Sequence, residues 1–319
     1  MFEEESRAKS ALYLAFFLTL FGYAGRYFAV EPVNNQFFPF AAWSFVLLAD
    51  NLAWRFKGSS PLVSRTEEFL VLAAWSAAFG ALAELLNLRL GAWDYTGMCS
   101  TLSTRWTGRL FSWAAALPSV FVLAELLEAL RLFRGIRSRP FRLPSSAPAL
   151  AASSGALLLA AALAFPSACW PLAVPAPFLL AEPLLLELGL PSLLRELSGG
   201  LPAKTLRLAV SGLLCGLLWN WWNSAAGASW VYRAPDWLSQ APRLIYAGFP
   251  FLALSLYSLY SLASWLRGGR TWEEASWTAP GRRPHPALKW AAAAAVPVVC
   301  YAALRAVDAR TVSLFLGWI

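Results

Sequence analysis

Four acidic residues stand inside long apolar stretches of the sequence, and the chemistry they could carry is proton transfer. They are Asp50, Glu84, Glu125 and Glu182. A charged side chain at the centre of a bilayer costs about 2.5–3.5 kcal/mol on insertion scales, so each such residue is a functional-site hypothesis. Burial favours the neutral carboxylic acid, which can donate a proton to an apolar substrate. These four acids are therefore candidate catalytic residues.

A second set of residues is suited to binding a polar group. Asparagines near the ends of two apolar runs are each followed by a Trp-x-Tyr sequence, and the set comprises Asn87, Trp93, Tyr95, Asn220, Asn223, Trp230 and Tyr232. Amides together with indole and phenol rings suit a lipid headgroup, a sugar or a polyprenyl phosphate. The same residues also suit hydrogen bonds between helices and anchoring at the membrane interface.

Simpler roles exist for the acids as well. Asp50 and Glu182 could cap helices or pair with loop arginines such as Arg55 and Arg195. Glu84 and Arg26 lie near the outer ends of two apolar runs and should be level in the membrane. Pairing is the cheapest way to keep both charges ionised, so we predict a Glu84–Arg26 ion pair.

The composition excludes several kinds of site. The only histidine is His285, so bis-histidine haem, di-iron, His-based zinc and Ser-His-Asp sites are ruled out. The sequence has no phosphate-binding GxxxxGK[ST] motif. Cys99, Cys169, Cys215 and Cys300 show no metal-ligand spacing, although Cys99 and Cys169 fall in loops on one predicted side, which leaves a disulfide open. We expect no cofactor and no metal.

The elements that carry these residues are membrane helices. The chain is 58% hydrophobic and 14% charged, with a mean hydropathy of +0.52, whereas soluble domains carry about 25% charged residues. We predict an all-α integral membrane helical bundle of about nine transmembrane helices. Apolar windows place them near 10–29, 37–54, 69–88, 109–131, 148–165, 171–190, 206–222, 244–266 and 288–306.

Many of the 17 tryptophans flank these runs, and we interpret them as interfacial anchors. They include Trp43, Trp54, Trp93, Trp113, Trp170, Trp230, Trp265 and Trp290.

The basic residues indicate the orientation. Most of the 26 Lys and Arg residues stand at the N-terminus and in the loops after even-numbered spans. The positive-inside rule then places the N-terminus in the cytoplasm and the protein in a bacterial inner membrane. The net charge of +8 is spread over short loops, so we expect no nucleic-acid partner. Membrane lipids and other membrane subunits are the partners that this composition suggests.

The polar residues also recur in a common order, which predicts an internal duplication. Phe45-Val-Leu-Leu-Ala-Asp50 is similar to Pro177-Phe-Leu-Leu-Ala-Glu182, and a serine, Ser60 or Ser192, follows each acid ten residues later. The Asn and Trp-x-Tyr elements come next in both halves. We predict two parallel four-helix repeats plus a C-terminal helix. The parts are a cytoplasmic N-terminus 1–9, repeat 1 at 10–133, a linker 134–147, repeat 2 at 148–268, a cytoplasmic loop 269–287, and a final helix with a short tail at 288–319.

These residues resemble a family of uncharacterised bacterial polytopic membrane proteins with duplicated Glu/Asn-x-x-Asn and Trp-x-Tyr repeats. The resemblance covers most of residues 37–255 and rests on Asp50, Ser60, Glu84-x-x-Asn87, Trp93-x-Tyr95 and their second copies. The second copy in that family usually reads Trp-Glu-x-x-Asn, and here Asn220 replaces the acid. The resemblance implies an architecture and no reaction.

Three functions fit the sequence, which does not decide whether the chain is an enzyme. The first is a protein that binds or modifies a lipid or isoprenoid with an intramembrane carboxylate, and it ranks slightly ahead. The second is a transporter or flippase built from tandem repeats. The third is a structural or accessory subunit of a larger membrane complex.

Overall fold

The computed structural model describes residues 2–273 and 284–316, which divide into two compact units. Unit 1 is drawn from Met1–Val122, Leu217–Arg233 and Ala294–Ile319, and unit 2 from Leu123–Gly216 and Ala234–Ala293. Parts of the predicted loop 269–287 and tail 288–319 lie outside the described residues. Each unit takes segments from both predicted repeats, so the repeats do not coincide with the units.

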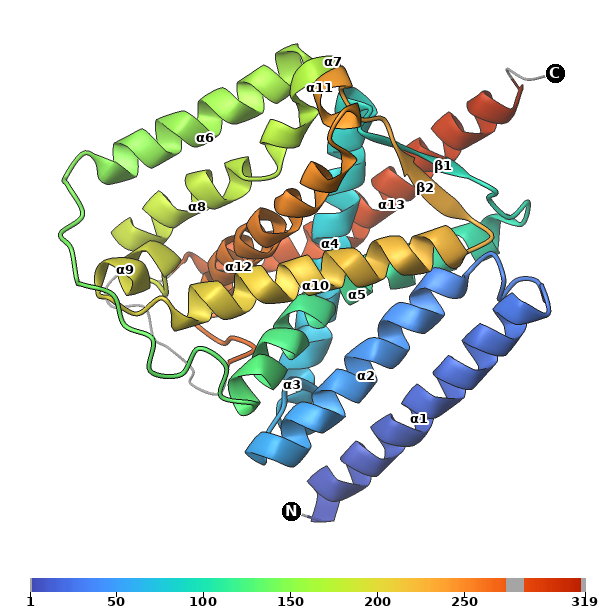
Figure 1. Cartoon of the computed structure of the whole chain (residues 1–319), viewed down its shortest axis with the longest axis horizontal. Helices are drawn as coiled ribbons and strands as arrows, with labels where there is room; N and C mark the ends of the chain where they lie inside the picture. The colour runs from blue at the N-terminus through green and yellow to red at the C-terminus, as the bar shows by residue number, and fades with distance from the viewer. Residues whose placement is uncertain (1, 274–283, 317–319) are drawn as a thin grey trace. The chain divides into compact units, whose positions relative to one another are not determined.

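Among the described residues, unit 1 contains six long helices or parts of them, one short helix and two strands (Figure 1). They are α1 (Phe2–Tyr27), α2 (Phe37–Lys57), α3 (Pro61–Ser64), α4 (Thr66–Leu90), β1 (Trp93–Thr96), most of α5 (Leu102–Ala129), β2 (Ser229–Tyr232) and most of α13 (Pro286–Leu316). The last residues of α10 also belong to this unit. Helices α1 and α2 run side by side.

Unit 2 is made of shorter helical pieces (Figure 1). They are α6 (Ala147–Ala164), α7 (Pro166–Cys169), the 3-10 helix η1 (Trp170–Ala173), α8 (Ala176–Glu187), α9 (Leu193–Ser198), most of α10 (Ala203–Ala225), α11 (Asp236–Ser239), η2 (Pro242–Ala247) and α12 (Gly248–Leu266). The predicted span 171–190 is divided between η1 and α8. Prolines stand in the first turns of both, where a missing backbone N–H is tolerated, and one further proline, Pro183, lies inside α8.

The prediction of an all-α membrane bundle is confirmed. Within residues 2–273 and 284–316, eight helical segments are long and apolar enough to cross a membrane, so the chain is a multi-pass membrane protein. They overlap eight of the nine predicted spans, although two of them begin about two turns earlier than predicted. The remaining one, 206–222, is the helix α10, whose asparagines, indoles and charged residues lower its hydropathy.

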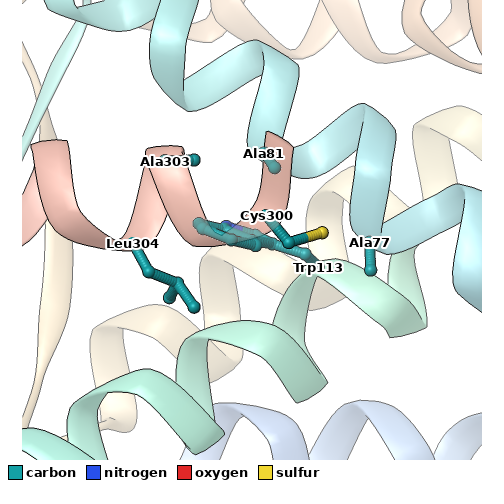
Figure 2. Close-up of a cluster of buried hydrophobic side chains, with 6 residues drawn as sticks. All are labelled: Ala77, Ala81, Trp113, Cys300, Ala303 and Leu304. Atoms are coloured by element: carbon teal, nitrogen blue, oxygen red, sulfur yellow. The ribbon is translucent and has the colours of Figure 1, made fainter. Parts of the chain in front are cut away.

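The core of unit 1 includes a cluster where α4, α5 and α13 meet. Its buried members are Ala77, Ala81, Trp113, Cys300, Ala303 and Leu304, and the Trp113 ring lies beside Cys300 and Ala81 (Figure 2). The backbone of Gly80 approaches this ring so closely that a Cβ atom there would overlap it. Trp113 is 7% exposed, so its interpretation as an interfacial anchor is wrong. It fills the space that small residues on the neighbouring helices leave.

The core of unit 2 contains a row of buried serines on one face of α12. Ser255, Ser258, Ser261 and Ser264 recur every third residue, and all are buried. The Ser255 hydroxyl donates to the Val174 carbonyl at 2.9 Å and accepts from the backbone N–H of Phe178 at 3.2 Å. Ser255 thus serves backbone groups at the start of α8, where the first N–H groups of a helix have no partner within it.

Candidate functional site

Two of the predicted catalytic acids hold the starts of short helices. Asp50, which is fully buried on α2, accepts a hydrogen bond of 2.7 Å from the Ser60 hydroxyl and one of 2.9 Å from the backbone N–H of Leu62. The Ser60 oxygen in turn accepts from the N–H of Val63 and caps α3. Asp50 therefore has partners on both oxygens and fixes the turn that follows its own helix.

Glu182 makes the same arrangement in unit 2. Its Oε2 atom accepts from the Ser192 hydroxyl at 2.6 Å and from the N–H of Leu194 at 3.0 Å, while Ser192 caps α9. Its Oε1 atom accepts from Ser258 of α12 at 2.6 Å. The serines at the predicted ten-residue spacing are thus the partners of the two acids.

The asparagines of the two motifs also act alike. The Asn87 side chain donates to the Trp93 carbonyl at 2.8 Å and accepts from the N–H of Ala92 at 2.8 Å. The Asn223 side chain donates to the Trp230 carbonyl and accepts from its N–H, both at 2.8 Å. Each amide therefore clamps the start of a Trp-x-Tyr strand onto the end of the preceding helix.

The two strands that these clamps hold pair with each other. β1 and β2 are antiparallel, with Trp93 opposite Tyr232 and Tyr95 opposite Trp230. Side chains alternate along a strand and opposite residues share a face, so these four aromatic side chains lie on one face of the ribbon. The structure thus brings together four of the seven predicted binding residues. We call the part of unit 1 around β1 and β2 the strand end.

The other face of the ribbon is fixed by charge. The Asp94 carboxylate accepts from Arg233 of the following segment and from the Arg310 Nη2 atom at 3.0 Å. Arg310 also donates to the carbonyl of Asn87 at 3.2 Å. These contacts tie β1 to α13 and leave the aromatic face turned the opposite way.

Glu84 of α4 lies against the aromatic face. It is 4% exposed, and its Oε1 atom accepts a hydrogen bond from the Tyr95 hydroxyl and a long one, 3.4 Å, from the Trp93 indole. The Trp113 indole lies near the same carboxylate, but no hydrogen bond joins Oε2 to a described residue. One oxygen of this acid is therefore held, and the other is buried without a hydrogen-bond partner among the described residues.

Burial raises the pKa of the Tyr95 hydroxyl well above its ordinary value of about 10, and the neighbouring Glu84 charge raises it further. The hydroxyl therefore remains a hydrogen-bond donor to Glu84 at neutral pH.

Arg109 supplies a positive charge at the same place. The side chain is 5% exposed, and its guanidinium carbon lies 4.7 Å above the centre of the Tyr95 ring. Its Nε, Nη1 and Nη2 atoms all lack a hydrogen-bond partner within the described part of the chain. Its charge acts on Glu84, yet no ion pair joins the two side chains in residues 2–273 and 284–316. A buried guanidinium without partners is costly, and it demands an explanation.

The predicted Glu84–Arg26 ion pair is wrong for the described structure. Arg26 donates to the carbonyl of Ala225 and, at 3.2 Å, to the side chain of Asn34. The end of α10 presents bare carbonyl oxygens, and these attract the Arg26 guanidinium. Arg109 takes the place near Glu84 that we expected Arg26 to occupy.

Sequence reasoning missed the role of Arg109. The predicted span began at 109, which put this arginine at the membrane edge, whereas α5 begins at Leu102 and places it two turns inside the helix. The signal that could have revealed it is the sequence Arg105-Trp-Thr-Gly-Arg109. Two arginines four residues apart fit one turn of a helix, so both can belong to the same helix.

The remaining predicted residues lie elsewhere. Glu125 is buried on α5 in unit 2, and Asn220 is half-buried on α10; both have interaction partners. All four cysteines are free thiols, so Cys99 and Cys169 are not paired. No group of three or more metal-ligating side chains occurs in the described residues.

Comparison with known proteins gives no match: no family model, no curated protein and no solved structure is similar to this chain.

Proposed function

We propose that this membrane protein binds the polar end of a lipid or isoprenoid at the strand end of unit 1, between Glu84 and Arg109. The observation that supports this most directly is that buried polar atoms of both side chains lack partners among the described residues. Asp50 and Glu182, by contrast, use their oxygens on serines and helix starts. Of these acids, Glu84 is the one with an oxygen left for a ligand.

The surroundings favour an amphiphile over a free polar solute. The site lies between membrane helices and beneath a ribbon of two Trp and two Tyr side chains. Aromatic rings of this kind sit at the boundary between headgroups and hydrocarbon, where they contact both parts of a lipid. A ligand with a polar end and an apolar chain matches that boundary.

Glu84 also supports a chemical role. Its Oε1 atom is held by Tyr95, which orients the carboxyl group, while Oε2 is open. A general acid or base needs a fixed carboxyl group with one free oxygen within reach of the substrate. Modification of the bound amphiphile by proton transfer is therefore the enzymatic form of this proposal.

An accessory subunit is a second candidate, and exposed apolar side chains favour it. Leu150 and Leu157 of α6 and Val298 of α13 are each more than 60% exposed. Such faces suit either lipid or a neighbouring helix. The third class, a transporter, lacks a comparable observation, because the acids that suggested it hold helix starts.

The test is purification in a gentle detergent followed by mass spectrometry of bound lipids. We expect the native protein to carry a lipid or isoprenoid, and Arg109→Gln and Glu84→Gln to lose it. The control is Arg89→Gln, which removes an exposed arginine from α4 and should keep the lipid. Equal lipid content in all four proteins contradicts the proposal, and partner proteins without lipid favour the accessory subunit.

We further infer that the chain contains two like-oriented copies of one unit, as the resemblance to the repeat family implies. The matching acid–serine and asparagine–strand contacts support this. Two copies related by an axis along the membrane normal would bring their equivalent strands together antiparallel, and β1 and β2 pair in that way.

We infer the orientation from the positive-inside rule. It predicts that the protein lies in a bacterial inner membrane with its N-terminus on the cytoplasmic side. Cys99 should then face outward. We expect a membrane-impermeant maleimide to label Cys99 in intact cells of a variant carrying Cys169→Ser, and the further change Cys99→Ser to abolish the label. Labelling that requires broken cells contradicts this orientation.

A further inference from the structure

We propose that the group held at this site is an oxyanion, a phosphate or carboxylate at the end of an apolar chain, with Arg109 as its anchor. This inference rests on the proposed function and adds the chemical class of the ligand. It follows from which polar atoms of the site have hydrogen-bond partners among the described residues and which have none.

The open atoms of the site are mostly hydrogen-bond donors. Arg109 carries five N–H donors and uses none of them on the described chain, and the Nε1 atom of Trp230 is buried without a partner as well. Among the side chains of the site that the structure describes, Glu84 Oε2 is the one buried acceptor without a partner. A ligand that satisfies six donors and one acceptor must be rich in acceptor oxygens, as a phosphate or carboxylate is.

The contact between Arg109 and Tyr95 prepares the guanidinium for such a ligand. The guanidinium carbon lies 4.7 Å above the centre of the ring, and this cation–π contact helps to fix the group in place. Its buried nitrogen atoms make no hydrogen bond to the described residues, so their N–H donors are left for a ligand. A fixed planar fork of this kind binds two oxygens of one oxyanion in parallel.

Glu84 does not compete for this fork. Its Oε1 atom is engaged by Tyr95 and Trp93, and no ion pair connects it to Arg109 in the described residues. The acid and the arginine therefore remain available to the same ligand, with the anion on Arg109 and a protonated oxygen or hydroxyl of the ligand directed at Oε2.

A quaternary ammonium headgroup is the main competing ligand, because four aromatic side chains share one face of the ribbon. Aromatic cages bind such cations through the faces of their rings. The Tyr95 ring, however, already contacts the Arg109 guanidinium, and that positive charge would repel a cationic headgroup. The geometry thus favours an anion over a cation.

The second motif cannot provide an equivalent site. It has Asn220 where the first has Glu84, so it offers no carboxylate at that position. The site is accordingly expected once per chain, and binding should saturate at one ligand per protein.

The test measures quenching of tryptophan fluorescence in the purified, delipidated full chain. The probes are farnesyl phosphate, palmitate, uncharged farnesol, dodecyltrimethylammonium and inorganic phosphate. Native protein should bind farnesyl phosphate at least about tenfold more tightly than farnesol, as a charge-assisted bidentate contact implies. Palmitate should share this preference if any oxyanion is accepted, and inorganic phosphate alone should bind weakly because it lacks the chain.

Arg109→Gln should remove the preference for the anion, and Arg109→Lys, which keeps the charge without the fork, should retain part of it. Arg89→Gln is the control and should bind as the native protein does. A native protein that binds farnesol and farnesyl phosphate equally, or that prefers the ammonium probe, overturns the oxyanion assignment while the amphiphile site stands. A native protein that prefers free phosphate to farnesyl phosphate keeps the oxyanion and overturns the amphiphile site. A native protein that binds none of the chain-bearing probes overturns the proposed function itself. Gel filtration shows whether each variant is folded. If Arg109→Gln does not fold, the binding of Arg109→Lys tests the assignment.

Discussion

The hydroxyl of Ser60 donates a hydrogen bond of 2.7 Å to the carboxylate of Asp50 and at the same time caps helix α3. Ser192 and Glu182 repeat this relationship around α9 with a distance of 2.6 Å. An acid that accepts from a helix cap and from the backbone beyond it shapes a turn. The geometry therefore gives these acids a structural role, and Glu84 is the acid that we propose meets the ligand.

Removal of either serine should lower stability without affecting bound lipid. Ser60→Ala and Ser192→Ala each leave a buried carboxylate oxygen with one partner fewer, which costs about 1–3 kcal/mol. The midpoint of thermal unfolding in detergent should fall by several degrees. Ser10→Ala, an exposed position on α1, is the control and should leave the midpoint unchanged. Lipid lost at an unchanged midpoint would instead restore Asp50 and Glu182 as functional acids.

The sequence predicted the membrane helices well because hydropathy alone determines where a chain can cross a bilayer. It also identified the pairs of acids and serines, since their ten-residue spacing recurs. It could not assign their partners, because whether an acid caps a helix or faces a ligand depends on how the following loop folds back. Arg109 was missed for a related reason: two additional helical turns at the start of α5 separate an interfacial arginine from a buried one.

The Asn87 and Asn223 clamps should be interdependent because their strands pair. Asn87→Ala frees the start of β1, and its partner β2 then loses its ladder. We expect faster hydrogen exchange at the backbone amides of both 93–96 and 229–232 in Asn87→Ala and in Asn223→Ala. The amides of α2 should exchange at the native rate and serve as the internal control. Faster exchange confined to the mutated clamp's own strand contradicts this coupling.

Arg105 and Asp308 should act as a coupled pair between α5 and α13. Two parallel hydrogen bonds of 2.7 and 2.8 Å join them, and both side chains are largely shielded from solvent. Contacting residues couple by about 0.5–3 kcal/mol, so Arg105→Gln with Asp308→Asn should lower the unfolding midpoint less than the two single changes combined. The exposed Lys9–Glu5 pair of α1, examined by the same cycle, should show almost no coupling. Additive losses at Arg105 and Asp308 rule out the pair.

Gly80 should tolerate no side chain. A Cβ atom there would overlap the Trp113 side chain in the core where α4, α5 and α13 meet, so Gly80→Ala should destabilise the protein by about 1–3 kcal/mol. Gly248→Ala is a matched control, because no atom lies within 4 Å of a Cβ atom built at that glycine. Equal unfolding midpoints for the two variants would show that α4 and α5 do not pack this closely.

The raised pKa of Tyr95 should appear as a dependence of stability on alkaline pH. Burial and the Glu84 charge both favour the neutral phenol in the folded state, whereas an unfolded tyrosine ionises near pH 10. The folded protein therefore binds the proton more tightly, and this contribution is complete below pH 10 and declines as the pH rises above it. Tyr95→Phe has no proton to lose. Its unfolding midpoint should be lower than that of the native protein at pH 8, and the difference should narrow between pH 10 and 11. A difference that stays constant over this range contradicts a buried, hydrogen-bonded Tyr95 hydroxyl.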